Sequence, residues 1–182
     1  MKIVEDEICQ GLVAHLDVEA LRRTGKSRSS TPLHSCGGKK TFMVLGVSPK
    51  SGDVLALPLF SVGDGRPKYE PLERALKSYL GNDTQVRRHW VDTNSYYHNT
   101  QVWLIPMREF CDASEIEMSK AGQRMYYAKD REYIFAEIVN QLPIGQRHKS
   151  KWGNVVGVAG YNYSPSGYYK HASIYEPTRS TN

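Results

Sequence analysis

Two apolar runs separated by a short polar turn place the strongest constraint on how this chain of 182 residues folds. Residues 41–47 (TFMVLGV) and 54–60 (VLALPLF) are too short for typical helices, and Pro49 and Gly52 between them are typical of a hairpin turn. We therefore expect two antiparallel strands. Pro58 has no amide hydrogen to donate, so it indicates a sheet edge or a bulge near the strand end.

The rest of the chain predicts a mixture of strands and helices. Alternating or apolar patterns predict further strands at 11–17, 86–91 and 100–107. Helical spacing or capping signals predict helices at 70–80, 112–120 and 129–142, with a short one at 18–23. Ser114 and Glu117 have the spacing of a capping box, and Asp130 can cap the helix that Pro143 ends. This order favours an α+β domain built on a small, mostly antiparallel barrel or curled sheet.

Positive charge is concentrated in two segments. Residues 22–40 hold six Lys and Arg residues and no acid, and residues 143–182 hold five with a single acid, Glu176, in a chain of net charge +5. Basic segments on a slightly acidic body suggest a polyanion as partner, although solvated loops have the same composition. The second segment is also rich in Gly, Ser and Tyr, so we divide the chain into a domain, 1–142, and a basic tail, 143–182.

Several classes of protein do not fit this sequence. No apolar run approaches the length of a membrane helix, and the acidic N-terminus lacks the apolar core of a secretory signal. Cys9, Cys36 and Cys111 are far apart and odd in number, which argues against a disulfide framework or a zinc site. The six histidines show no metal-binding spacing. We expect a cytoplasmic protein with free thiols and no metal or cofactor.

The open end of the predicted hairpin gathers side chains that could act on a phosphate group. If 41–47 pairs with 54–60, Lys40 and Ser61 lie at the same open end, where the flanking loops add Lys39, Arg66 and Lys68. Several cations and a hydroxyl suit a phosphodiester, because the cations neutralise charge that develops on the phosphate. RNA also supplies its own nucleophile, the 2′-hydroxyl. The simpler alternative is solvated lysines and a serine that bonds to nearby backbone.

Two further features have a functional and a structural interpretation. His89 and His98 lie in segments that can approach one another, and a histidine pair suits acid–base cleavage of RNA. Packing at a solvated strand end explains the same residues. The tail holds five of the twelve tyrosines beside scattered cations, a mixture that can stack bases, remain disordered or bind a partner. Its segment 154–160 (NVVGVAG) has the composition of a strand.

The order of these segments resembles the MazF/Kid/PemK toxin superfamily, and within it the ToxN-like toxins of type III toxin–antitoxin systems. In that group a lysine precedes the second strand, as Lys40 precedes TFMVL here. A PLTS-like ending closes the next strand, where this chain has Pro58-Leu59-Phe60-Ser61, and 102–107 (VWLIPM) is similar to the MIP-type segment. The resemblance covers residues 11–142 and implies an SH3-like barrel that cuts RNA without a metal.

The hairpin end, the basic segment 22–40 and the resemblance together indicate the candidate site residues. The catalytic candidates are Lys40, Ser61 and Lys68. The RNA-binding candidates are Lys39, Arg66, Arg22, Arg23, Lys26 and Arg28. Two positions depart from the family pattern: Lys40-Thr41 stands where MazF-like toxins have an Arg-Pro pair, and Phe60 replaces the usual threonine.

The sequence therefore predicts a metal-independent endoribonuclease toxin that leaves a 2′,3′-cyclic phosphate. Such a protein implies an RNA substrate and an antitoxin, either RNA or a small protein, with no membrane partner and with self-association open. The alternative is a non-catalytic nucleic-acid-binding barrel, such as a regulator or a mobile-element protein, because binding alone requires the same cations.

Overall fold

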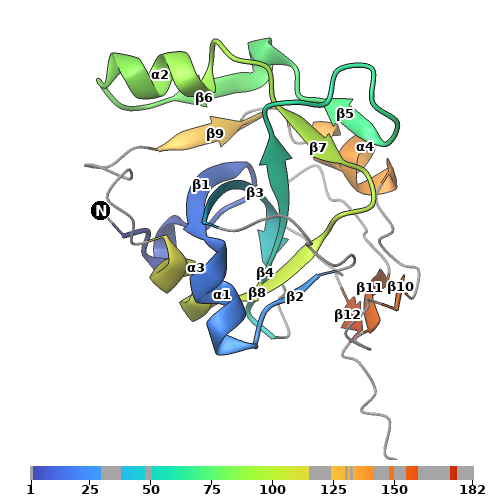
Figure 1. Cartoon of the computed structure of the whole chain (residues 1–182). Coiled ribbons are helices and arrows are strands. Elements are labelled where there is room, and N and C mark those ends of the chain that lie inside the picture. Colours follow the sequence, from blue (N-terminus) through green and yellow to red (C-terminus); the bar gives the residue numbers. More distant parts are fainter. Residues whose placement is uncertain are drawn as a thin grey trace, which may run out of the picture.

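A nine-stranded antiparallel sheet organises the chain in the computed structural model (Figure 1). The structure describes residues 2–29, 38–47, 51–114, 124–129, 131, 133–141, 148–149, 155–159 and 173–175. The strands of this sheet are β1 (Leu12–Asp17), β2 (Arg28–Ser29), β3 (Lys39–Val47), β4 (Asp53–Phe60), β5 (Tyr69–Pro71), β6 (Lys77–Tyr79), β7 (Tyr96–His98), β8 (Trp103–Pro106) and β9 (Met125–Tyr127). The α-helices are α1 (Val18–Thr24), α2 (Thr84–Trp90), α3 (Met107–Ala113) and α4 (Tyr133–Gln141), and short 3₁₀ turns occupy Glu5–Glu7 and Arg74–Leu76.

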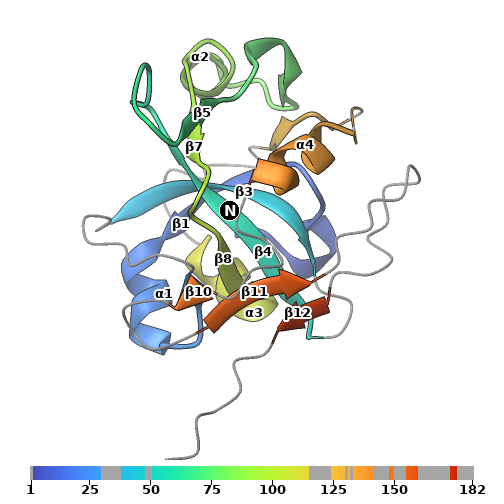
Figure 2. The same cartoon turned by 90° about the vertical axis from the view of Figure 1, so that its right-hand side faces the viewer.

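The architecture is α+β, as the sequence predicts. The strands run in the order β2-β8-β4-β3-β1-β9-β6, and β7 pairs with both β4 and β5. Among the described strands, β2 and β6 remain as the two ends of this path, so the sheet is not closed into the expected barrel. It is nevertheless curved, and Figure 2 shows β3 as a long bowed strand.

The predicted hairpin is confirmed as β3 and β4, although the interpretation of Pro58 as an edge residue is wrong. β4 lies inside the sheet, with β3 on one side and both β8 and β7 on the other. Ala56 pairs with β8 and Leu59 pairs with β7, so Pro58 lies where β4 changes partner and no amide hydrogen is required. The irregularity in the hairpin is elsewhere, on β3 between Val44 and Gly46.

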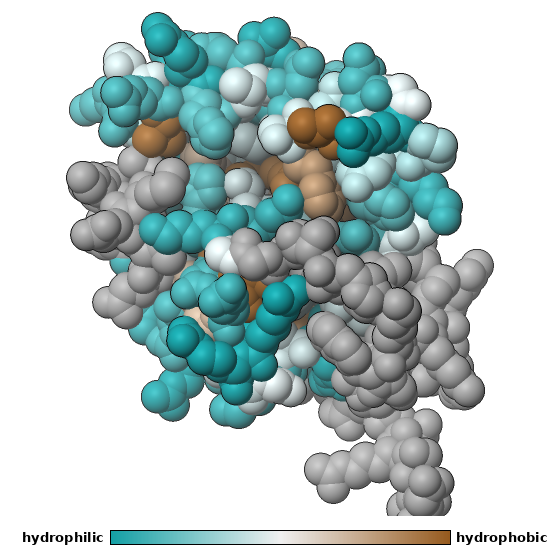
Figure 3. All heavy atoms as spheres, in the orientation of Figure 1, coloured by the Kyte–Doolittle hydropathy of each residue, from teal (hydrophilic) through white to brown (hydrophobic). Residues whose placement is uncertain are grey.

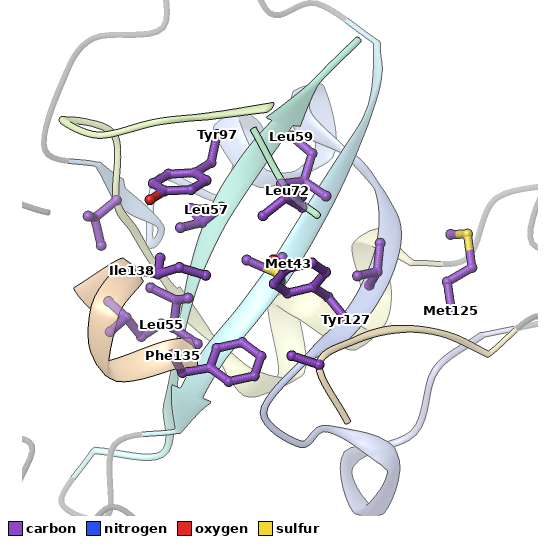
Figure 4. Close-up of a cluster of buried hydrophobic side chains, with 14 of the residues drawn as sticks. Met43, Leu55, Leu57, Leu59, Leu72, Tyr97, Met125, Tyr127, Phe135 and Ile138 are labelled. Carbon is purple, nitrogen blue, oxygen red and sulfur yellow. The ribbon is translucent and has the colours of Figure 1, made fainter. Parts of the chain in front are cut away.

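Helices cover both faces of the sheet. On one face, Val18 and Leu21 of α1 and Phe110 of α3 pack on side chains of β1, β3 and β4. On the other face, Phe135 and Ile138 of α4 pack against the sheet, as Figure 4 shows for their contacts around β3 and β4. We call these the α3 face and the α4 face. Because side chains alternate along a strand, each residue of β3 and β4 is assigned to one face.

The predicted helix at 70–80 is wrong, because this segment forms β5, a 3₁₀ turn and β6. Its backbone bonds to distant parts of the chain: Leu72 N donates to Ser95 O at 2.8 Å, and Leu80 N donates to Arg124 O at 3.1 Å. Lys77 pairs with Tyr127 in the β6–β9 ladder. Tertiary pairing with strands outside the segment therefore overrides the local helical spacing.

The predicted strand at 86–91 is also wrong, because residues 84–90 form α2. The side chain of Asp83 accepts hydrogen bonds from the amides of Gln85 and Val86 at 2.8 and 3.2 Å, which caps the helix. Val86 and Trp90, four residues apart, supply its apolar side, and Trp90 is buried. The aspartate before the threonine was the sequence signal for this helix.

The remaining elements agree only in part with expectation. The strands β1 and β8 and the helices α1 and α4 are confirmed within one to four residues. Of the helix predicted at 112–120, residues 115–120 lie outside the described residues, and α3 ends at Ala113. The Ser114 hydroxyl donates to Cys111 O and accepts from Ile3 N. Glu117, Asp130 and Leu142 lie outside the described residues.

The predicted tail, 143–182, lies largely outside the described residues. Three short strands within it, β10 (His148–Lys149), β11 (Val155–Ala159) and β12 (Ser173–Tyr175), form their own antiparallel sheet. β11 matches the strand-like segment identified from the sequence.

Candidate functional site

A cleft opens at the end of the β3–β4 hairpin, below α2. Its volume is about 70 Å³, and its polar lining comprises His15, Thr41, Ser61, His89, Thr93, Asn94 and Ser95. Figure 3 shows apolar atoms in the recess between the region of α2 and the sheet, on an otherwise hydrophilic face. We call this cavity the histidine cleft.

His15 is the most perturbed titratable group of the cleft. It lies on β1 opposite Thr41 of β3, and its Nδ1 is 3.0 Å from the Thr41 hydroxyl oxygen. Burial, with smaller contributions from His89 and Lys39, lowers the pKa of His15 from 6.5 to about 4. The imidazole is therefore uncharged at neutral pH. When Nδ1–H donates to Thr41, the lone pair of Nε2 is left to accept a proton.

His89 supplies a second imidazole from α2. The ring centroids of His15 and His89 are 6.4 Å apart, and His89 is exposed to solvent. The sequence hypothesis paired His89 with His98, whereas the ring that His89 approaches is His15. His98 lies on β7, where its ring contacts Tyr69 and its Nδ1 bonds to the Thr100 hydroxyl at 2.8 Å.

The two adjacent lysines of the hairpin, Lys39 and Lys40, lie on opposite faces of the sheet. Thr41 and its neighbour Leu59 line the cleft on the α4 face, so alternation places Lys39 on this face too. The effect of Lys39 on the pKa of His15 agrees with that position. Lys40 lies on the α3 face with Phe42, and its Nζ is 3.9 Å from the centroid of the Phe60 ring.

The structure thus brings Lys40 and Ser61 to the same end of the hairpin, as expected, but toward different surroundings. Ser61 lines the histidine cleft, and Lys40 lies over Phe60, which also lines the cleft. Phe60, where the family pattern has threonine, thus contacts the catalytic candidate Lys40 and also lines the cleft that holds the two histidines.

A buried lysine holds one wall of the cleft. Lys77 is only 6% exposed, and its Nζ donates to Trp90 O at 3.1 Å, to Thr93 O at 2.7 Å and to Ser95 Oγ at 2.7 Å. All three acceptors belong to residues that line the cleft. Burial, followed by the charge of Arg74, lowers the pKa of Lys77 to about 8, so the ammonium form still predominates at neutral pH.

The other predicted RNA-binding residues do not line the cleft. Arg66 and the catalytic candidate Lys68 are exposed in the loop after β4. Arg22 and Arg23 are exposed in the last turn of α1. Near the other end of the sheet, Lys26 pairs with Glu109 at 3.3 Å and Arg28 pairs with Asp53 at 3.7 Å, so acids partly neutralise these two.

Sequence reasoning missed His15 and Thr41 as site residues. Their contact follows from pairing the strand at 11–17 with the hairpin, a step that the alternating pattern of both strands permitted. Thr93 and Asn94 had no recognisable signal. They reach the cleft because Lys77 holds the loop after α2.

The part of the chain that the structure describes contains no group of three His, Cys, Asp or Glu side chains arranged to hold a metal ion. Cys9 and Cys111 are free thiols there, and Cys36 lies outside the described residues. None of the described helices is long and apolar enough to cross a membrane.

The likeness to the MazF/Kid/PemK toxins remains a prediction from sequence motifs. No protein-family model, no curated protein and no solved structure matches the chain.

Proposed function

We propose that the protein is a metal-independent endoribonuclease that acts through the histidine cleft. One observation carries the proposal: an uncharged, half-buried His15 lies 6.4 Å from an exposed His89 in a cleft that also holds Ser61 and lies beside Lys39. Two imidazoles at this separation can stand on either side of a phosphodiester, one to remove a proton and one to supply it.

In the proposed reaction, Nε2 of His15 accepts the proton of the ribose 2′-hydroxyl. The 2′-oxygen forms a bond to phosphorus, the bond from phosphorus to the 5′-oxygen breaks, and His89 donates a proton to the leaving oxygen. The products are a 2′,3′-cyclic phosphate and a 5′-hydroxyl. Lys39 neutralises charge on the phosphate, and the Ser61 hydroxyl donates to one of its oxygens.

The toxin assignment extends this proposal. The motifs around Lys40 and Ser61 support a distant relationship to MazF-like and ToxN-like toxins, with the curved sheet as an opened variant of an SH3-like barrel. Under this proposal the antitoxin, an RNA or a small protein, covers the open end of the hairpin. It also places the protein in the cytoplasm, where its RNA substrate is found.

The test is cleavage of mixed-sequence RNA by the full chain in EDTA. We expect 5′ fragments that end in 2′,3′-cyclic phosphate and no cleavage of DNA. His15→Gln and His89→Gln should each lower the rate about a hundredfold or more. Arg108→Gln, at an exposed position of α3, is the matched control and should cut at the wild-type rate.

Two results would contradict the proposal. One is a strict requirement for magnesium, and the other is fragments with 3′-hydroxyl ends. RNA that is bound but never cut would instead favour the non-catalytic binding protein that the same cations allow.

A further inference from the structure

Three aromatic side chains form a row on the other side of the hairpin end. Phe60 of β4 and Tyr69 of β5 have ring centroids 5.4 Å apart, and Tyr69 and His98 of β7 have centroids 4.8 Å apart. Successive rings are nearly perpendicular, at 84° and 90°. All three side chains are partly exposed, and neither hydrophobic cluster contains them. We call this set the aromatic row.

Strand register accounts for the position of the row. Tyr69 pairs directly with His98, and alternation sends Leu59 and Tyr97 into the core on the opposite side. Tyr96, which pairs with Phe60, is buried, because Gly63 leaves no room above it: a Cβ at Gly63 would lie 2.6 Å from the Tyr96 ring. The loop after β4 thus covers Tyr96 and leaves the row partly open.

A lysine lies near each end of the aromatic row. Lys40 Nζ lies 3.9 Å from the centroid of Phe60, and Lys68 is close enough to His98 to help burial lower the pKa of that imidazole. The loop after β4 carries Asp64 beside Arg66 and Lys68, and Glu70 follows in β5, opposite Tyr97 on the side away from the row. The surface of the row thus combines the flat faces of the rings with a small excess of positive charge.

We propose that the aromatic row binds unpaired bases of an RNA strand whose backbone passes through the histidine cleft. Rings interleaved with cations bind single strands, because every base has a face that can stack and every phosphate needs neutralisation. Phe60 belongs to both regions, since it lines the cleft and begins the row, so one strand can engage both. The inference rests on the proposed function for the identity of the ligand and adds a base-binding surface to it.

The experiment measures binding of an RNA that cannot be cut. The probe is a fluorescein-labelled, 2′-O-methylated oligouridylate of about twelve nucleotides, which falls within the usual site size. Fluorescence anisotropy of the full chain gives Kd for wild type, Tyr69→Leu and Tyr69→Phe. Tyr133→Ala is the control, because Tyr133 is 55% exposed on α4, away from the row.

We expect Tyr69→Leu, which keeps apolar bulk but loses the ring, to raise Kd about tenfold. Tyr69→Phe and Tyr133→Ala should bind as wild type does. Because ring stacking releases no counterions, the ratio of the variant Kd to the wild-type Kd should persist at roughly 0.2 M salt, where phosphate contacts weaken. Circular dichroism and the melting temperature establish that each variant is folded.

The outcomes separate this inference from the proposed function. Equal binding by folded Tyr69→Leu, or equal losses in Tyr69→Leu and Tyr133→Ala, would overturn the row as a binding surface even if unmodified RNA is cut. Wild-type binding that depends on Tyr69, in a protein that never cuts RNA, would uphold the row and reject the nuclease. Absence of wild-type binding to the probe would overturn the row.

Discussion

The histidine cleft and the aromatic row lie at the same end of the β3–β4 hairpin, on opposite faces, and differ in what they can do. The cleft holds an uncharged imidazole, a second exposed imidazole and hydroxyl groups around a small recess. The row holds partly exposed rings with Lys40 over the first of them. Proton transfer needs the first environment, and base stacking needs the second.

The difference shows how strand alternation assigns function. Lys39 and Lys40 are adjacent in sequence, yet Lys39 lies on the side of His15 and Lys40 lies over Phe60. Under the proposed function, these two cations would serve two steps, charge stabilisation at the cut and contact with the strand beside it. The family resemblance assigns the phosphate to Lys40, whereas the geometry of the cleft favours Lys39.

The largest expected effect separates these two lysines. Lys39→Met should lower the cutting rate at saturating RNA about a hundredfold, because charge on the phosphate would lose the cation that lies on the side of His15. Lys40→Met should leave that rate within roughly a factor of two and weaken RNA affinity instead. Single-turnover cleavage, with affinity measured separately, checks both. The reverse pattern would restore Lys40 to the role that the resemblance implies.

A second prediction compares the histidines of the two regions. The unfolded chain takes up a proton on His15 near pH 6.5, whereas the native state does so near pH 4. The free energy of unfolding should therefore fall as pH drops through this window, by about 2–3 kcal/mol from this group. His15→Gln should flatten that dependence in urea unfolding curves measured from pH 7 to pH 4.

His98 of the row provides the comparison for this measurement. Burial and Lys68 also lower its pKa, so His98→Gln should change the pH dependence in the same direction but by less. Equal pH profiles for wild type and His15→Gln would show that the cleft does not keep His15 uncharged.

The smallest expected effect is on the free energy of unfolding, when Lys77 in the wall of the cleft is replaced. Lys77→Met removes the donor to Trp90 O, Thr93 O and Ser95 Oγ, and should lower the free energy of unfolding by about 1–2 kcal/mol. Lys129→Met is the matched control, since Lys129 is exposed with its Nζ 4.9 Å from the Tyr126 ring, and it should cost under about 0.5 kcal/mol.

The same pair of variants tests whether the two regions are independent. NMR signals of the His89 ring should shift in Lys77→Met, because the loop after α2 loses its anchor, while those of His98 should stay unchanged. Shifts of equal size at both histidines would show that Lys77 supports the whole end of the sheet.

Local sequence determined the hairpin and therefore the end of the sheet at which the site lies. The apolar runs and the Pro–Gly turn of 41–60 specify β3 and β4 without help from distant residues. Alternation within 11–17 likewise predicts β1, although the position of His15 opposite Thr41 follows only from the pairing of β1 with β3. These elements were predictable because their turn and periodicity signals lie within a few residues of one another.

Tertiary structure decided the elements that surround β1, β3 and β4. The 70–80 segment has helical spacing, yet Lys77 buries its ammonium among three acceptors and β6 pairs with β9, so distant partners overrule the local pattern. The position of α2, and with it the approach of His89 to His15, depends on burial of Trp90 against β6 and β9. Such contacts join residues far apart in the chain, and no local propensity encodes them.

The sequence by itself thus placed two cations and a hydroxyl at one end of a hairpin. Only the packed fold determined which cation faces the histidines, because the face that a strand residue occupies is set by what covers each side of the sheet.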